Sequence, residues 1–248
     1  MTTVAVEAQG MVALLRLTNG VTNAIGSTLV AELSGALTRV AAEFDGCVLA
    51  GGNKFFCIGL DLPELIRFDR KKMSRFWDDF DQVVLDLYCL PVPTAAAIAG
   101  HATAGGTILA LGTDYRFIAA GRKLMGLNEI TIGVPVPHLA ALMLVRTVGE
   151  RAARDLQYRG ELIDPDTARN IGLVDEIGAE EKIEALAIEA IGAVADKPRG
   201  AFELIKRNRT EAVRREFESR RLEKKEEMLA CWFQPSVQKL LGKAAEKF

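Results

Sequence analysis

A glycine-rich segment in the middle of the chain reads Ala99-Gly100-His101-Ala102-Thr103-Ala104-Gly105-Gly106-Thr107-Ile108. The apolar residues before it, 94–98, predict a buried strand, and the apolar run through 104–111 predicts a helix that begins inside the segment. Backbone N–H groups at the start of a helix can hold an anion or a developing oxyanion. Small neighbouring residues also let helices pack closely, so this segment alone leaves both a site and a core contact open.

A second segment, nearer the N-terminus, reads Phe55-Phe56-Cys57-Ile58-Gly59-Leu60-Asp61-Leu62. Gly59 permits a tight backbone turn, and a turn just before a helix start directs free N–H groups toward one place. Asp61 is expected to cap the helix that begins at Leu62. Pro63 fits the first turn of that helix because its missing N–H costs nothing there.

A third segment reads Met125-Gly126-Leu127-Asn128-Glu129-Ile130-Thr131-Ile132-Gly133-Val134-Pro135, and it sets one carboxylate among apolar residues. Burial would raise the pKa of Glu129 and suit it to general-base catalysis near neutral pH. An exposed or capping glutamate in a turn fits this segment equally well.

Short strands alternate with helices around these segments. Strands are expected at residues 4–7, 12–17, 47–50, 94–98, 115–119, 123–126 and 173–177, and helices at 29–40, from 62, at 73–88 and at 104–111. Residues 54–61 are expected to form a loop, and a glycine turn should follow residue 98. This alternation favours an α/β layered core. The chain should be mainly helical beyond residue 137, and the charges of both signs at 206–227 favour a solvated helix face over a binding surface.

The composition is that of a globular protein. Its 248 residues are 49% hydrophobic and 26% charged, and the formal net charge of -2 gives no electrostatic reason to expect nucleic acid binding. The four cysteines and two histidines show no metal-ligand spacing, so reduced thiols and no metal are expected. The N-terminus lacks the features of a signal or transit peptide, which favours a cytoplasmic protein. The apolar run 94–111 contains glycines and a histidine and is interpreted as buried core, not a membrane span.

The order and spacing of the three segments resemble the crotonase (enoyl-CoA hydratase/isomerase) superfamily. The resemblance extends through residues 160–174 and covers essentially the whole chain. It implies the crotonase (ClpP/crotonase-like) α/β fold, a spiral of ββα units over residues 1–190, followed by a C-terminal helical oligomerisation region at 191–248. It also implies assembly as a homotrimer or a dimer of trimers.

The same resemblance implies roles for individual residues. The backbone N–H groups of Leu60 and Gly105 would form an oxyanion hole, and Glu129 would be the catalytic acid/base. The residues expected to contact an acyl-CoA thioester are Ile58, Gly59, Leu60, Asp61, Leu62, Gly105 and Asn128. Coenzyme A is then part of the substrate, and neither a metal nor a further cofactor is implied.

One position departs from the hydratases of the superfamily. Those enzymes carry a glutamate shortly after the glycine run and a second in the later segment, and together these residues position a water molecule. Ile108 occupies the first position here, and an isoleucine can neither activate water nor donate a proton. The loop sequences Gly-Leu-Asp-Leu and Gly-Leu-Asn-Glu resemble those of the Δ3,Δ2-enoyl-CoA isomerases. This resemblance favours isomerisation of 3-enoyl-CoA to 2-trans-enoyl-CoA in fatty-acid β-oxidation.

Other interpretations stay open at this point. A hydratase, or a hydrolase of CoA thioesters, could take its acid from an unexpected position. A homologue without turnover could bind acyl-CoA or RNA, the latter through the basic cluster at 206–209, although neighbouring acids favour a solvated helix there. His138 is interpreted as a polar residue at a helix start, and His101 as a core histidine with its hydrogen bonds satisfied.

Overall fold

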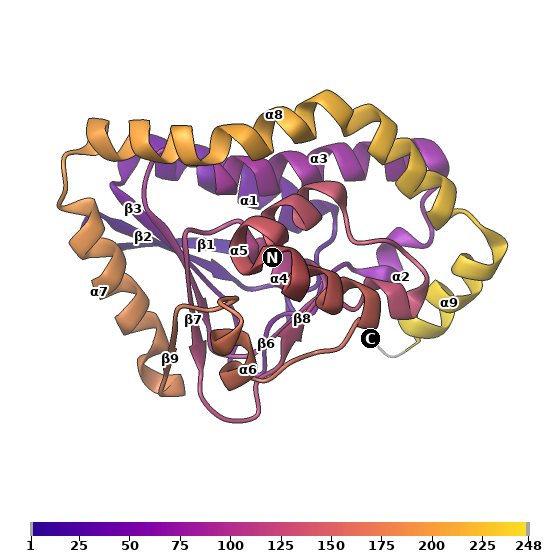
Figure 1. Cartoon of the computed structure of the whole chain (residues 1–248), viewed down its shortest axis with the longest axis horizontal. Coiled ribbons are helices and arrows are strands. Elements are labelled where there is room, and N and C mark those ends of the chain that lie inside the picture. Colours follow the sequence, from indigo (N-terminus) through magenta and orange to yellow (C-terminus); the bar gives the residue numbers. More distant parts are fainter. Residues whose placement is uncertain (1, 247–248) are drawn as a thin grey trace.

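The computed structural model describes residues 2–246, which form two sheets enclosed by helices (Figure 1). The larger sheet has six strands in the order β1-β2-β3-β5-β7-β9, and only the β1–β2 pair is antiparallel among these described strands. Its strands are β1 (Val4–Gln9), β2 (Val12–Leu17), β3 (Gly46–Ala50), β5 (Thr94–Ile98), β7 (Tyr115–Ala119) and β9 (Glu176–Gly178).

The smaller sheet determines where the site segments meet. It has three parallel strands in the order β4-β6-β8, namely β4 (Phe55–Cys57), β6 (His101–Thr103) and β8 (Met125–Gly126). Each follows a strand of the larger sheet along the chain, which gives the repeated unit of the expected spiral. Because the carboxyl ends of parallel strands share one edge, the segments that follow β4, β6 and β8 come together there.

The structure corrects three local expectations. The expected loop at 54–61 contains strand β4, and the expected glycine turn after residue 98 contains β6. Strands of three residues are too short for hydrophobic alternation to reveal them. The strand expected at 173–177 lies instead at Glu176–Gly178, because the N–H groups of Leu173 and Val174 donate to the Ala168 carbonyl and not to a neighbouring strand.

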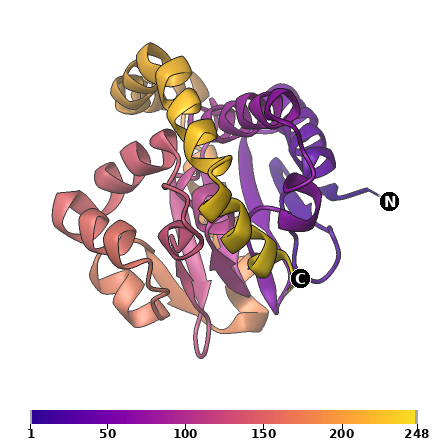
Figure 2. The ribbon, with the colours of Figure 1, turned by 90° about the vertical axis from the view of Figure 1, so that its right-hand side faces the viewer.

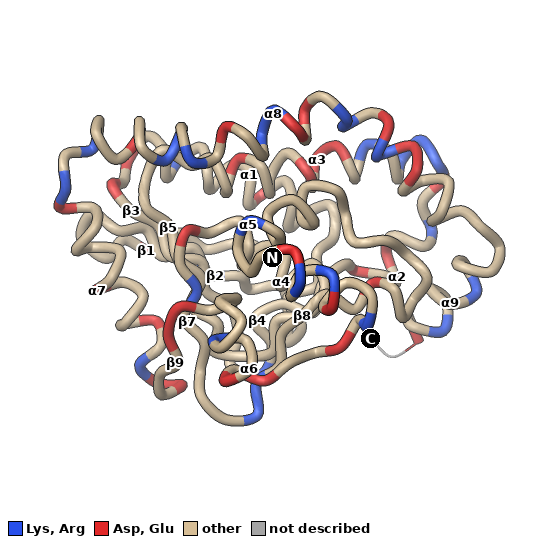
Figure 3. Tube along the Cα trace, in the orientation of Figure 1, with Lys and Arg blue, Asp and Glu red and all other residues tan. Residues whose placement is uncertain are grey.

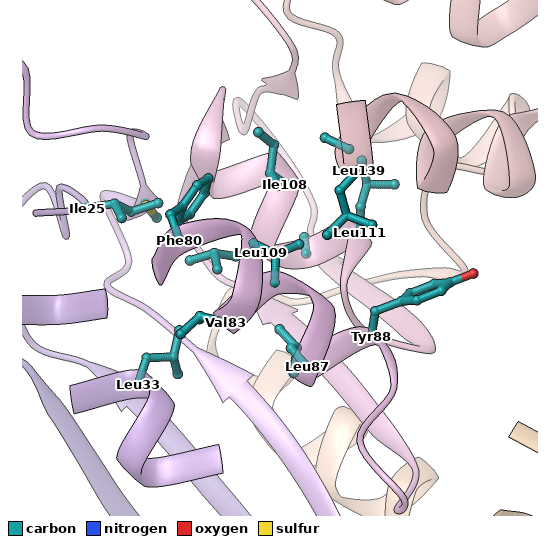
Figure 4. Packing of buried hydrophobic residues seen from close by; sticks show 14 of the residues in the cluster. Ile25, Leu33, Phe80, Val83, Leu87, Tyr88, Ile108, Leu109, Leu111 and Leu139 are labelled. Carbon is teal, nitrogen blue, oxygen red and sulfur yellow. The ribbon is translucent and has the colours of Figure 1, made fainter. Parts of the chain in front are cut away.

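Helices cover both faces of the larger sheet, so its central strands are buried on both sides. The helices are α1 (Ser27–Glu43), α2 (Leu62–Leu65), α3 (Arg70–Tyr88), α4 (Gly105–Leu111), α5 (His138–Arg159), α6 (Pro165–Asn170), α7 (Ile183–Ala195), α8 (Arg199–Trp232) and α9 (Pro235–Ala245), with 3-10 turns η1 (Glu129–Ile132) and η2 (Glu180–Lys182). In β5, Ala96 faces the main core, whereas Ala95 and Ala97 face α7. Figure 4 shows part of the main core, where α3 packs against α4. None of the helices within residues 2–246 is both long and apolar enough to cross a membrane.

The C-terminal helices leave the sheet and then return to the site. Helix α8 runs along one side of the molecule over α3, and α9 turns back toward α2 (Figures 1 and 2). Val237 and Leu241 of α9 are buried in the main core. The division expected at residue 190 falls inside α7, which packs on the larger sheet through Ile183 and Ile191. The helical region that departs from the sheet therefore begins with α8.

Charges of both signs follow α8 along its length (Figure 3). One of them, Lys206, does not lie on the expected solvated face, because its side chain is only 3% exposed. Its Nζ donates to the Asp114 carboxylate at 2.7 Å and to the Val92 carbonyl oxygen at 2.9 Å. The buried ion pair and the hydrogen bond to Val92 attach the first half of α8 to the segments that precede β7 and β5.

Candidate active site

A cavity of about 500 Å³ lies where the three sequence segments meet. The C-terminal helices also contribute to it, through Trp232 at the end of α8 and Ala244 of α9. Its lining residues are Val21, Thr22, Lys54, Phe55, Ile58, Leu60, Leu62, Trp77, Phe80, Ala104, Gly105, Ile108, Asn128, Glu129, Ile132, Val134, Pro135, Pro137, Trp232 and Ala244. The lining is mainly apolar with few polar groups, as is usual for a small-molecule site.

Two glycine backbones approach closely at one side of this cavity. A Cβ atom placed on Gly59 would lie 3.0 Å from the Gly105 nitrogen and 3.0 Å from the Ala104 Cβ. A Cβ atom on Gly105 would in turn lie 3.1 Å from the Gly59 Cα. Gly59 also has φ +100°, a conformation that favours glycine. The close approach brings the N–H of Leu60, which follows Gly59, next to the N–H of Gly105.

Neither of these two N–H groups donates to an acceptor among residues 2–246, although both residues line the cavity. Hydrogen bonds hold the surrounding backbone: Thr103 Oγ1 donates to the Ile58 carbonyl at 2.9 Å, and the Ala104 N–H donates to the Gly126 carbonyl at 2.8 Å. Ala104 itself has φ +49°, a strained conformation for an alanine at the start of α4. Two backbone donors fixed in this way can hold an oxyanion without reorganising.

Glu129 supplies a carboxylate to the same cavity. Glu129 is the first residue of η1, which follows β8, and it is only 6% exposed. Its Oε2 has no hydrogen-bond partner among the described residues, and burial raises the pKa of Glu129 to about 7. No other Asp or Glu within residues 2–246 lines the cavity, and Ile108, which does line it, is 2% exposed. A carboxyl with this pKa can accept and return a proton near neutral pH.

The raised pKa predicts a stability effect. An ordinary carboxyl titrates near 4.5, and Glu129 in the folded protein titrates near 7. The contribution of Glu129 to the free energy of unfolding should therefore be largest below about pH 4.5, decrease between these two values and stay constant above pH 7. We expect Glu129→Gln to be more stable than the wild type at pH 8, by about 2 to 3 kcal/mol. Urea unfolding at pH 8 and pH 4 measures this, and a gain that is equal at both values would contradict the burial of a charge.

The structure brings most of the predicted site residues together. Ile58, Leu60, Leu62, Gly105, Asn128 and Glu129 all line the cavity. Gly59 does not line it but shapes the turn beside it. Asp61 does not line it either, because its carboxylate accepts the Glu64 N–H at 3.1 Å and caps α2. Asp61 therefore caps α2 as expected. Its expected contact with acyl-CoA stays a prediction, because Asp61 does not line the cavity.

The two histidines lie away from the cavity lining. His101 Nδ1 accepts the Leu124 N–H at 3.0 Å, but the residue is only half-buried and is not part of the core that was expected for it. His138 begins α5 and lines a separate, small cavity, where its Nε2 is buried without a partner among the described residues. Residues 2–246 contain no cluster of three His, Cys, Asp or Glu side chains that could hold a metal ion.

The aromatic residues of the cavity were not predicted from the sequence. Trp77 and Phe80 come from α3, and Trp232 comes from the last turn of α8. An aromatic pair three residues apart is typical of any amphipathic helix that packs on a core, so Trp77 and Phe80 carry no separate signal. Trp232 becomes a site residue only because α8 folds back over the cavity.

Comparisons with known proteins agree with this geometry. The family described as Enoyl-CoA hydratase/isomerase matches residues 7–247. The human protein Enoyl-CoA delta isomerase 1, mitochondrial, is 30% identical over 204 residues, which are 81% of this chain and 68% of the human one. A probable enoyl-CoA hydratase of Mycobacterium avium is 30% identical over 195 residues, 77% of this chain and 74% of the other. The crystal structure of human mitochondrial delta3-delta2-enoyl-CoA isomerase matches with a TM-score of 0.95 at 28% identity, covering 99% of this chain and 97% of that one.

The comparisons also correct one expectation. The human relative and the human crystal structure are both named mitochondrial, and a bacterial protein matches as well. These names contradict the predicted cytoplasmic location, which rested only on the composition of the N-terminus. The expected crotonase fold, in contrast, is confirmed by the structural match. The chain belongs to the enoyl-CoA hydratase/isomerase family and is an enzyme of the crotonase superfamily.

Proposed function

We propose that the protein converts 3-enoyl-CoA to 2-trans-enoyl-CoA, as a Δ3,Δ2-enoyl-CoA isomerase of fatty-acid degradation. The substrate thioester oxygen would accept hydrogen bonds from the Leu60 and Gly105 N–H groups, and Glu129 would lie beside the carbon chain. Coenzyme A is part of the substrate, and the proposed reaction uses no metal and no further cofactor. Assembly as a homotrimer or a dimer of trimers stays a prediction.

The proposed reaction moves one proton. The C2 protons of a 3-enoyl thioester are acidified by both the thioester and the double bond, and the Glu129 carboxylate takes one of them. The resulting dienolate carries its negative charge on the thioester oxygen, where the two N–H groups stabilise it. The protonated Glu129 then gives its proton to C4, and the double bond moves into conjugation with the thioester. The reaction consumes no water.

One observation carries this choice among the reactions of the superfamily: within residues 2–246 a single buried carboxylate lines the cavity, with the apolar Ile108 also in the lining. The hydratases of the superfamily use two glutamates to position water and to deliver its oxygen and proton, whereas isomerisation needs only one base that takes a proton and then returns it. The human relative named as a delta isomerase supports the same choice. The raised pKa of Glu129 suits both halves of the cycle because the two forms of the carboxyl are close in free energy near pH 7.

Product analysis tests the reaction class. We expect the purified protein neither to hydrate trans-2-hexenoyl-CoA nor to hydrolyse the thioester of hexanoyl-CoA. Both substrates should stay unchanged on the time scale on which the protein isomerises trans-3-hexenoyl-CoA. Mass spectrometry and a thiol reagent follow the two side reactions. Water addition or thioester cleavage that outpaces isomerisation would replace the proposed function by hydration or hydrolysis.

The pH dependence provides a further prediction. The base must be ionised in the free enzyme, and burial sets the pKa of Glu129 to about 7. We expect kcat/KM to be constant well above pH 7 and to decrease tenfold per pH unit well below it. Initial rates between pH 5.5 and pH 9 measure this profile, about 7 being the expected midpoint. A kcat/KM that stays nearly constant down to pH 5.5, as a carboxyl with the ordinary value of 4.5 would give, would argue against a buried base.

A further inference from the structure

Three aromatic side chains close the buried end of the cavity. Trp77, Phe80 and Trp232 are 4%, 1% and 0% exposed, and we call them the end wall. The rings of Trp77 and Trp232 meet edge to face with centroids 6.3 Å apart, and those of Trp77 and Phe80 are 6.0 Å apart. Such aromatic pairs form a stiff, well-packed boundary.

The cavity also has an end that is open to solvent. Val21 is 66% exposed, and Lys54 is also an exposed residue of the lining. The charged nucleotide part of an acyl-CoA must stay at this exposed end, since burying its phosphates without partners would be costly. The acyl chain therefore points from the thioester toward the end wall.

A second, much smaller cavity of about 20 Å³ lies beyond the end wall. Its lining residues are Trp77, Asp81, Pro137, His138, Phe217, Arg221, Lys224, Lys225 and Met228. Trp77 and Pro137 line both cavities, so the indole of Trp77 is part of the partition between them. On one side of this partition the space is apolar, and on the other it is bordered by titratable and cationic side chains.

We infer that Trp77 is a specificity-determining residue that sets the longest acyl chain the site accepts, an inference that rests on the proposed binding of acyl-CoA. Each methylene that leaves water for the apolar cavity should tighten binding about fourfold. The gain must stop when the chain end reaches the indole, because the end wall is fully packed. Without the indole, a longer chain could fill the space that the ring vacates, which is bordered by Phe76, Phe80 and Trp232.

The contact between the acyl chain and the Trp77 indole can be measured in the wild-type protein through its tryptophan fluorescence. Trp77 and Trp232 are the chain's two tryptophans, and both belong to the end wall. We would titrate the protein with saturated acyl-CoA thioesters from butanoyl to dodecanoyl and follow tryptophan emission. The expected result is an emission change that begins at a certain chain length, at which the gain in affinity per methylene also stops. Affinity that increases through dodecanoyl-CoA, or emission that no bound chain alters, would overturn the inference.

Two variants of Trp77 complete the test. We expect Trp77→Ala to extend the gain in affinity by about two methylenes, so that the ratio of the butanoyl-CoA Kd to the dodecanoyl-CoA Kd increases about fifteenfold. Trp77→Phe keeps most of the ring and removes an indole N–H that has no partner among the described residues, so its length limit should lie close to that of the wild type. An unchanged length profile in Trp77→Ala, with wild-type affinity for butanoyl-CoA, would overturn the inference.

The same titrations separate this inference from the proposed function. Saturated thioesters cannot isomerise, so their binding is independent of the chemistry at Glu129. Binding with a length limit that Trp77 sets would support the inference even if isomerase activity were absent. Failure of every acyl-CoA to bind would overturn the proposed function and this inference together, whereas binding without a length limit would overturn the inference alone.

Discussion

Replacing Glu129 by glutamine is expected to lower kcat for isomerisation by about 10² to 10⁴ while leaving the affinity for a saturated acyl-CoA nearly unchanged. Glutamine keeps the shape of the side chain but cannot take a proton from C2. The residue is 6% exposed, so the substitution exchanges one buried polar group for another of similar size and should not disturb the cavity. Steady-state rates with trans-3-hexenoyl-CoA and calorimetric titration with hexanoyl-CoA measure the two quantities separately.

Asn128→Ala is the matched control for this substitution. Asn128 precedes Glu129 and also lines the cavity, but its side chain cannot act as a base at any pH. We expect its effect on kcat to be much smaller than that of Glu129→Gln. If both variants lost activity equally, the loss would reflect damage to the segment and not removal of a base.

The second large effect is expected from Gly59→Ala. The added methyl group would lie 3.0 Å from the Gly105 nitrogen and 3.0 Å from the Ala104 Cβ, and the backbone at φ +100° disfavours any side chain. The two N–H groups of the proposed oxyanion hole would be pushed apart. Removal of one oxyanion donor typically costs about 10² to 10³ in kcat, and we expect a loss of this size.

Gly121→Ala controls for backbone strain alone. Gly121 has φ +91°, close to that of Gly59, but a Cβ atom there would meet no atom within 4 Å. Both variants should lose stability from the strained backbone, measured by thermal unfolding, with a larger loss for Gly59→Ala because of its close contacts, and only Gly59→Ala should lose isomerase activity. Equal activity in the two variants would mean that the approach of Gly59 to Gly105 has no part in catalysis.

The sequence was informative where chemistry constrains the backbone. The turn at Gly59, the helix start at Gly105 and the carboxylate of Glu129 follow from glycines and an isolated charge in apolar surroundings. The strands at 12–17, 94–98 and 115–119 were predicted with their observed bounds because each is a short, mainly apolar run. These features depend on local sequence, so they can be predicted without coordinates.

Features that depend on distant contacts could not be predicted in the same way. Lys206 lies in a run of charges that is typical of a solvated helix, and only its pairing with Asp114 of another segment explains its burial. Trp77 and Trp232 become neighbours because α8 passes over α3, and nothing in either local sequence indicates this. The end wall and the buried ion pair are therefore findings of the structure.

The most direct test of the central claim is the absorbance of the conjugated thioester when trans-3-hexenoyl-CoA is added to the wild-type protein and to Glu129→Gln side by side. We predict that the wild type produces the conjugated 2-enoyl thioester and that the variant does so far more slowly at the same substrate occupancy. No conjugation by the wild type, or equal rates for the two proteins, would contradict a single-carboxylate isomerase.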